Sequence, residues 1–132
     1  MASIRKEIRI DSRPEKVWDA VRDIGNIQKR LVPGFVTDCQ MEGSDARIVT
    51  FGNGMVVKEI IVDLDDPSRR LCWLAKSERL THYNASMQIF ADGNGTRAVW
   101  IADLLPNEAA PAIGAMIEQG LGAMKKALER TG

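Results

Sequence analysis

The sequence predicts an α+β fold in which a curved, seven-stranded antiparallel sheet wraps around one long C-terminal helix. Three observations lead to this prediction: an alternating strand pattern precedes a short helical region, six further strand patterns follow, and an amphipathic helix pattern ends the chain. A sheet with one apolar face and a helix with one apolar side can bury both against each other. Since 132 residues suffice for one core, we expect a single domain over residues 1–132.

The first elements are a strand and two short helices. In residues 4–10, Ile4, Ile8 and Ile10 fall on one face of an extended chain and charged side chains fall on the other, which is typical of a half-buried strand. A helix is expected to begin near Pro14, because proline has no N–H to leave unpaired in the first turn, and Asp11 or Ser12 is expected to cap it. After a Gly-Asn break, residues 27–31 are expected to form another helical turn.

The remainder of the chain predicts six strands and one helix. Residues 108–130 carry apolar side chains along one side and charged side chains along the other, which predicts a long amphipathic helix. Glycine, asparagine, aspartate, proline or serine marks most of the joints between strands, so successive hairpins are the simplest topology. The strand candidates are residues 35–41, 46–51, 55–64, 70–76, 83–91 and 96–104.

The composition argues against several classes of protein. Eighteen basic and eighteen acidic residues give a net charge of zero, so the chain has no basic field to attract nucleic acid. Charged residues interrupt every apolar run, so we expect neither a signal peptide nor membrane insertion, and a cytoplasmic location. Cys39 and Cys72 lack C-x-x-C spacing and are expected to be reduced. No cofactor or metal is expected, because no Cys/His cluster has ligand spacing.

A longer motif points to a family. Residues 10–23 read IDSRPEKVWDAVRD, and further matches occur at Asn53-Gly54, Glu59, Arg70-Leu71 and Trp100. This series resembles the START-like, or SRPBCC, superfamily, which includes polyketide cyclase/dehydratase-like proteins. The resemblance implies a helix-grip fold that encloses an elongated cavity for a hydrophobic or amphipathic small molecule. It does not select among lipid carriers, hormone receptors, cyclase subunits and stress-response proteins, because one fold serves several functions.

Two copies of the tripeptide Gly-Asn-Gly, at residues 52–54 and 93–95, control which way the neighbouring side chains point. A two-residue Asn-Gly loop and a three-residue loop with a bulge at the last glycine differ by one residue in register, which turns every neighbour to the other face. We expect the three-residue form at both positions. In the first hairpin this form places Arg47 opposite Glu59, among apolar residues.

In the second hairpin the three-residue form aligns Met87 with Ile101. It also places Tyr83 on the same face as this pair, toward the long helix. Trp100 and Phe90 then lie on the outer face of the sheet.

The inward-facing residues are candidates for binding a ligand. Arg47 and Glu59 could anchor a carboxylate or hydroxyl of the ligand or form a partly exposed cross-strand ion pair. Tyr83 could orient a ligand or serve as a core tyrosine. The absence of a side chain at Gly120 could widen a pocket or permit close packing of the helix on the sheet. The predicted ligand-binding set is Arg47, Phe51, Glu59, Tyr83, Met87, Ile101, Met116, Gly120 and Met124.

Three function classes fit these residues. The first is binding or transport of a small hydrophobic or amphipathic molecule in an internal cavity, which requires no catalytic residue. The second is a cyclase/dehydratase-like enzyme in which Glu59 acts as general base and Tyr83 or Arg47 stabilises an enolate. The third is a non-catalytic interaction or stress-response domain that uses the outer sheet face around Phe90 and Trp100. We expect a monomer or a homodimer.

Overall fold

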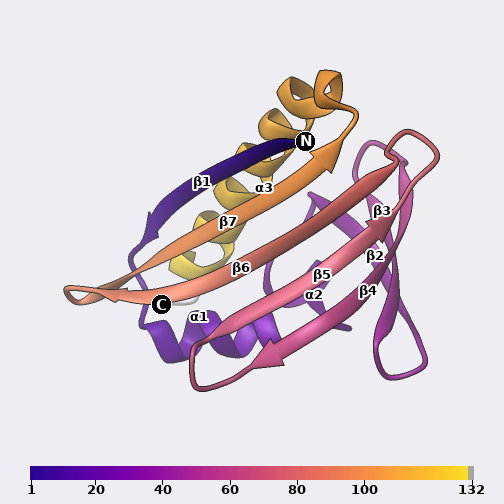
Figure 1. The fold of residues 1–132 in the computed structure, drawn as a ribbon. Helices are drawn as coiled ribbons and strands as arrows, with labels where there is room; N and C mark the ends of the chain where they lie inside the picture. Colours follow the sequence, from indigo (N-terminus) through magenta and orange to yellow (C-terminus); the bar gives the residue numbers. More distant parts are fainter. Residues whose placement is uncertain (131–132) are drawn as a thin grey trace.

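The structure is a computed structural model that describes residues 1–130, so the last two residues of the predicted domain lie outside the described range. Its seven strands form one antiparallel sheet in the order β1-β7-β6-β5-β4-β3-β2 (Figure 1), which confirms the predicted fold class. The elements are β1 (Ala2–Ile10), α1 (Pro14–Arg22), α2 (Ile27–Arg30), β2 (Val36–Glu42), β3 (Ala46–Phe51), β4 (Val56–Asp65), β5 (Arg70–Lys76), β6 (His82–Asp92), β7 (Gly95–Leu105), the 3-10 turn η1 (Asn107–Ala109) and α3 (Ala110–Arg130).

Helix α1 begins at Pro14 as predicted, but the predicted cap is wrong. Arg13 occupies the N-cap position with extended backbone angles, and its carbonyl accepts the first N–H groups of the helix. The residue before a proline is disfavoured in the helical conformation, so the helix cannot start earlier and Asp11 and Ser12 lie outside it. The Ser12 carbonyl instead accepts a hydrogen bond from Thr96 Oγ1 at 2.7 Å.

Hydrogen bonds connect helix α1 to the turn between β4 and β5. Trp18 Nε1 donates a hydrogen bond to Asp66 Oδ1 at 2.8 Å, and Arg22 Nε donates to the same oxygen at 2.8 Å. The hydrogen bond from Arg22, supported by that from Trp18, lowers the pKa of Asp66. These contacts hold α1 across one end of the sheet.

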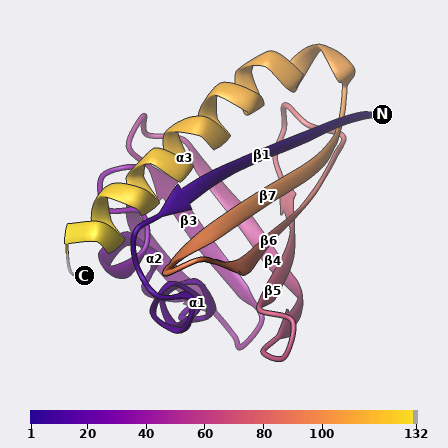
Figure 2. The same cartoon turned by 90° about the vertical axis from the view of Figure 1, so that its left-hand side faces the viewer.

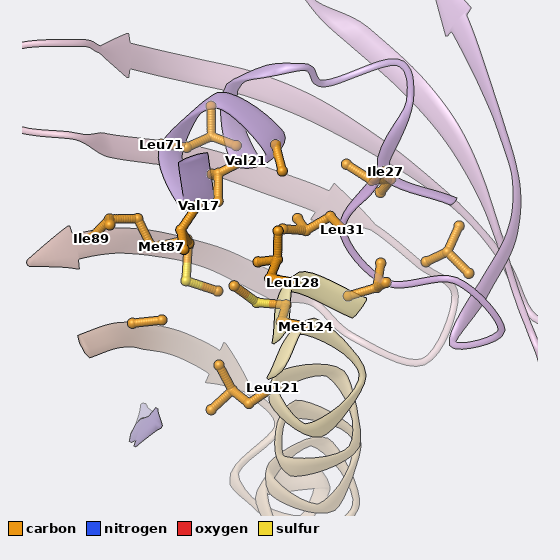
Figure 3. Close-up of a cluster of buried hydrophobic side chains, with 14 of the residues drawn as sticks. Val17, Val21, Ile27, Leu31, Leu71, Met87, Ile89, Leu121, Met124 and Leu128 are labelled. Carbon is orange, nitrogen blue, oxygen red and sulfur yellow. The ribbon is translucent and has the colours of Figure 1, made fainter. Parts of the chain in front are cut away.

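The long helix α3 crosses the face around which the sheet curves, and α1 and α2 lie near its C-terminal end (Figure 2). At that end the interior is filled. Met124 and Leu128 of α3 lie close to Leu31, beyond α2, and Val17 of α1, and Leu121 belongs to the same cluster of buried side chains lower on the helix (Figure 3). Within residues 1–130, no helix combines the length and the apolar character needed to cross a membrane.

The first Gly-Asn-Gly hairpin has the predicted register. Arg47 lies opposite Glu59, and the backbone N–H of Phe51 donates to the Met55 carbonyl at 2.8 Å across a three-residue loop. Gly54 has a φ of +90°, the left-handed conformation that a bulge of this kind requires. The predicted inward direction of Arg47 and Glu59 is therefore confirmed.

The register predicted for the second hairpin is wrong. Asp92 pairs with Gly95, so only Gly93 and Asn94 form the loop, and Gly93 carries the positive φ of +59°. A positive φ at the first central position is typical of a type II′ turn. Gly95 is required for a different reason: a Cβ there would lie 2.8 Å from the carbonyl oxygen of Ile10 on the neighbouring strand.

The corrected register exchanges two predicted directions on β7. Met87 lies opposite Trp100 and not Ile101, so Trp100 faces α3. Ile101 faces outward, between Arg5 of β1 and Ser86 of β6. Ile101 is therefore not a pocket residue, and the outer face around Phe90 lacks the tryptophan that the interaction hypothesis placed there.

Candidate functional site

A pocket of about 230 Å³ lies between the sheet and the N-terminal half of α3. Its wall combines side chains of α3, the segment from α2 to β2, and the inner face of strands β3 to β7, and it is almost entirely apolar. Of the predicted set, the residues that line it are Arg47, Phe51, Glu59, Tyr83, Met87, Met116 and Met124. Within the described part of the chain, the interior is thus packed at one end of α3 and open at the other.

The polar part of the wall is a buried ion pair on β3 and β4. Arg47 and Glu59 are only 4% and 8% exposed, and Arg47 Nε lies 2.9 Å from Glu59 Oε1. Arg47 Nη1 also donates to the Ile24 carbonyl at 3.0 Å, and the guanidinium lies 5.9 Å from the centre of the Trp73 ring. This burial excludes the partly exposed ion pair considered from the sequence.

The ion pair leaves one oxygen free to act in the pocket. Glu59 Oε1 accepts the hydrogen bond from Arg47, whereas Oε2 accepts none from residues 1–130. Because the two charges compensate each other, the pocket wall gains a hydrogen-bond acceptor without a net charge.

Two aromatic side chains on β6 and β7 add hydrogen-bond donors. Burial raises the pKa of the Tyr83 phenol, and the negative charge of Glu59 raises it further. The nearby Trp100 indole N–H lowers this pKa by a smaller amount. Tyr83 therefore keeps its proton. Trp100 Nε1 is buried and has no hydrogen-bond partner among the described residues.

Trp100 is the pocket residue that the sequence analysis assigned to the wrong face. A signal that could have placed it is the distribution of charge along β7. Arg97 and Asp103 are an even number of positions from Ile101, so all three lie on the same face of the strand. Charged residues mark the solvent side of a strand, so this face is expected to point outward. Trp100 belongs to the uncharged set, with Ala98 and Ala102, and that set faces the helix.

Gly120 does not widen the pocket. A Cβ at this position would lie 2.8 Å from Trp100 Cζ3 and 3.2 Å from Phe35 Cε2. The missing side chain therefore permits two rings to pack against α3, which is the close-packing alternative considered from the sequence.

Two exposed residues mark the mouth of the pocket. Among the residues that line it, only Arg79 and Ala112 are exposed. Arg79 belongs to the loop between β5 and β6, and Ala112 to the first turn of α3. Since an apolar cavity of about 150 Å³ holds benzene, a volume of about 230 Å³ suits one substituted ring or a short aliphatic chain.

No group of three or more His, Cys, Asp or Glu side chains within residues 1–130 is arranged to hold a metal ion. His82, the only histidine of the chain, is exposed and contacts Asn84. Cys39 and Cys72 are free thiols, and burial raises the pKa of each. The chemistry available at the pocket is that of Arg47, Glu59, Tyr83 and the Trp100 indole inside it, and of Arg79 at its mouth.

The family comparison covers nearly the whole chain. The model of a family described as polyketide cyclase / dehydrase and lipid transport matches residues 1–129. This chain belongs to that family. The resemblance seen in the sequence is thereby confirmed. Proteins of this family and fold commonly bind hydrophobic ligands. None of the curated proteins matches the chain.

Solved structures with low sequence identity share the fold. The protein XoxI from Bacillus cereus is 19% identical, with a TM-score of 0.86 and coverage of 97% of this chain and 96% of that one. A START superfamily protein from Mycobacterium smegmatis is 14% identical, with a TM-score of 0.74 and coverage of 98% and 95%. Ara h 8.0201 is 16% identical, with a TM-score of 0.73 and coverage of 96% and 97%. At these identities the likeness extends to the fold alone.

Proposed function

We propose that this protein binds a small, mostly apolar molecule in the pocket beneath the N-terminal half of α3. The observation that carries the proposal is an apolar pocket whose wall includes a buried ion pair, Arg47 and Glu59, in which only one of the two carboxylate oxygens accepts the arginine hydrogen bond. Pockets of this composition, with few polar groups on an apolar wall, are typical of small-molecule sites. The family description, which includes lipid transport, supports the same class of function.

The burial of Arg47 and Glu59 is easier to explain by a ligand than by stability. A buried ion pair contributes little compared with well-packed apolar residues of the same volume, because both charges lose their hydration. A pair retained in such a place is therefore suited to a hydrogen bond with something in the pocket. Glu59 Oε2 would accept a hydrogen bond from a ligand hydroxyl or amide, and Tyr83 would donate one to a ligand oxygen.

The contacts that we propose are of two kinds. Phe51, Met87, Met116 and Met124 provide apolar surface, and the unbranched methionines adapt to ligands of different outline. Arg47, Glu59 and Tyr83 provide polar contacts. The volume favours a single substituted ring over a long-chain lipid.

The first test is native mass spectrometry of freshly purified protein, which should show a co-purifying small molecule. Binding of a neutral probe, hydrocinnamamide, is then measured by saturation-transfer NMR. Ala112→Trp should close the mouth and remove the signal. Ala115→Trp is the matched control, because Ala115 is exposed on the same helix and does not line the pocket. Absence of both a co-purifying molecule and probe binding would contradict the proposal.

A second candidate function is proton abstraction of the cyclase/dehydratase kind. It is favoured by one observation: Glu59 and Tyr83 line the same pocket, the first with a free acceptor oxygen and the second with its proton held in place by burial. Glu59 would remove a proton beside a carbonyl, and Tyr83 would donate a hydrogen bond to the resulting enolate oxygen.

This enzyme hypothesis is tested with phenylacetone, a ketone of pocket size. The wild type should accelerate exchange of its α-hydrogens with deuterated water, and Glu59→Gln should slow the catalysed rate by about 10²-fold or more. Equal rates in the two proteins would remove Glu59 from any such mechanism. Circular dichroism of the variant checks that the fold is intact.

A further inference from the structure

We infer that Arg79 selects ligands that carry an anionic group, so that the pocket takes an amphipathic acid with its apolar body inside and its carboxylate at the mouth. The inference rests on the proposed function, because it assumes that the ligand occupies the pocket. It adds the chemical class of that ligand and the residue that recognises it.

The first evidence is the position of Arg79. Only two residues of the pocket lining are exposed, and Arg79 is the charged one. Its loop is held in a tight turn, in which the Arg79 backbone N–H donates to Ser77 Oγ at 3.2 Å and the Leu80 N–H donates to the Ser77 carbonyl at 3.4 Å. The turn therefore holds the backbone of residue 79 at the rim.

The second evidence is that the Arg79 guanidinium is unengaged. Its side chain forms no hydrogen bond or ion pair with any of residues 1–130, whereas Arg22 and Arg30 on the surface are held by aspartates. A guanidinium has five donors arranged to bind a carboxylate through two parallel hydrogen bonds. At the rim these donors face solvent and remain available to a ligand.

The third evidence is the contrast with the other arginine of the pocket. Arg47 is neutralised by Glu59 and donates to the Ile24 carbonyl, so an anion could bind it only by displacing an existing partner. Breaking a buried pair is costly, because it leaves a charge without compensation. Arg79 is thus the only uncompensated charge among the described residues that line the pocket.

The size of the pocket limits the rest of the ligand. A volume of about 230 Å³ below the rim accommodates one ring or a short aliphatic chain. The ligand class that fits both the pocket volume and the guanidinium at the rim is a monocyclic arylalkanoic acid or a short-chain fatty acid, with its carboxylate beside Arg79.

The experiment compares hydrocinnamate with hydrocinnamamide, which have the same ring and chain and differ in charge. Dissociation constants are measured by NMR titration for the wild type and for Arg79→Gln. We expect the wild type to prefer the acid by roughly threefold to tenfold, the range of a partly exposed charge-assisted contact. The Arg79→Gln variant should have equal dissociation constants for the acid and the amide. Its dissociation constant for the amide should equal that of the wild type.

Two controls separate a specific contact from general attraction. Lys76→Gln removes a neighbouring exposed charge that does not line the pocket, and it should retain the preference for the acid. In about 1 M sodium chloride, where the Debye length falls to about 3 Å, the wild-type preference should shrink while amide binding persists.

The outcomes distinguish this inference from the function on which it rests. Equal binding of acid and amide by the wild type would overturn the role of Arg79 and leave the pocket proposal standing. An acid preference that survives Arg79→Gln would also overturn it. Failure of both probes to bind the wild type, with no co-purifying molecule, would overturn the proposed function and this inference together.

Discussion

Replacing Gly120 with alanine should destabilise the protein, although alanine is the better helix former. A Cβ at Gly120 would lie 2.8 Å from Trp100 Cζ3, closer than carbon atoms approach without displacement. Trp100 cannot easily retreat, because its ring packs edge-on against Trp73 with centroids 5.8 Å apart. Gly122, two residues along the same helix, has no atom within 4 Å of its potential Cβ. It is therefore the matched control.

The magnitude follows from two opposing terms. Overpacking a core lowers the free energy of unfolding by about 1–3 kcal/mol. Replacing glycine with alanine in a helix raises it by about 1 kcal/mol. Because the indole is held in place, we take the upper part of the overpacking range, about 2–3 kcal/mol, so Gly120→Ala should lose about 1–2 kcal/mol of unfolding free energy. Gly122→Ala should gain about 1 kcal/mol, because only the helix term applies.

Thermal denaturation followed by circular dichroism measures both changes. At this chain length, 1 kcal/mol corresponds to about 4 °C in Tm, so the two variants should melt on opposite sides of the wild type. If Gly120→Ala were stabilised as much as Gly122→Ala, the close approach of Trp100 to α3 would be refuted.

Three other predictions concern charged and titratable groups. Glu59→Leu should cost about 3–5 kcal/mol by leaving Arg47 unpaired, and the double variant Arg47→Met/Glu59→Leu should unfold in more urea than the single variant. At neutral pH, the wild type should be more stable than Asp66→Asn, because the Asp66 carboxylate forms an ion pair with Arg22. The difference in denaturation midpoint should vanish as the pH falls below 3.8 through the lowered pKa of Asp66, because protonation then removes the ion pair. Tyr83, the only tyrosine of the chain, should show no phenolate absorbance at pH 10 in the folded protein, because its pKa is raised. Since the folded chain binds this proton more tightly than the unfolded chain, the free energy of unfolding should fall as the pH rises above 10.0.

Much of the fold could be predicted because local patterns and the tertiary structure agree. The strand alternation around Arg47 and Glu59 has only one register that collects the apolar residues on one face, and Gly54 supplies the left-handed residue for the bulge. The start of α1 at Pro14 was equally clear. The cap was not, because it depends on the conformation imposed on Arg13 by the proline that follows it.

The second hairpin could not be predicted from its turn alone. Gly93-Asn94-Gly95 repeats the tripeptide of the first hairpin, but a different glycine takes the positive φ. Gly95 is needed where β7 passes close to Ile10 of β1, a contact between residues far apart in the sequence. A tertiary contact therefore selects the register, and this one-residue shift moves Trp100 into the pocket and Ile101 out of it.

The two ends of α3 face different surroundings, a filled core at the C-terminal end and a pocket at the N-terminal end. In the second half, Leu121, Met124 and Leu128 reach α1 and the strands and fill the space between them (Figure 3). At the other end, Ala109 of η1 and Ala112 in the first turn of α3 line the pocket with only a methyl group each, beside the longer side chains of Ile113, Met116 and Ile117. One amphipathic helix therefore borders a core at one end and a pocket at the other. An unfilled gap would forfeit dispersion contacts along its walls, which supports the proposal that a ligand occupies the pocket.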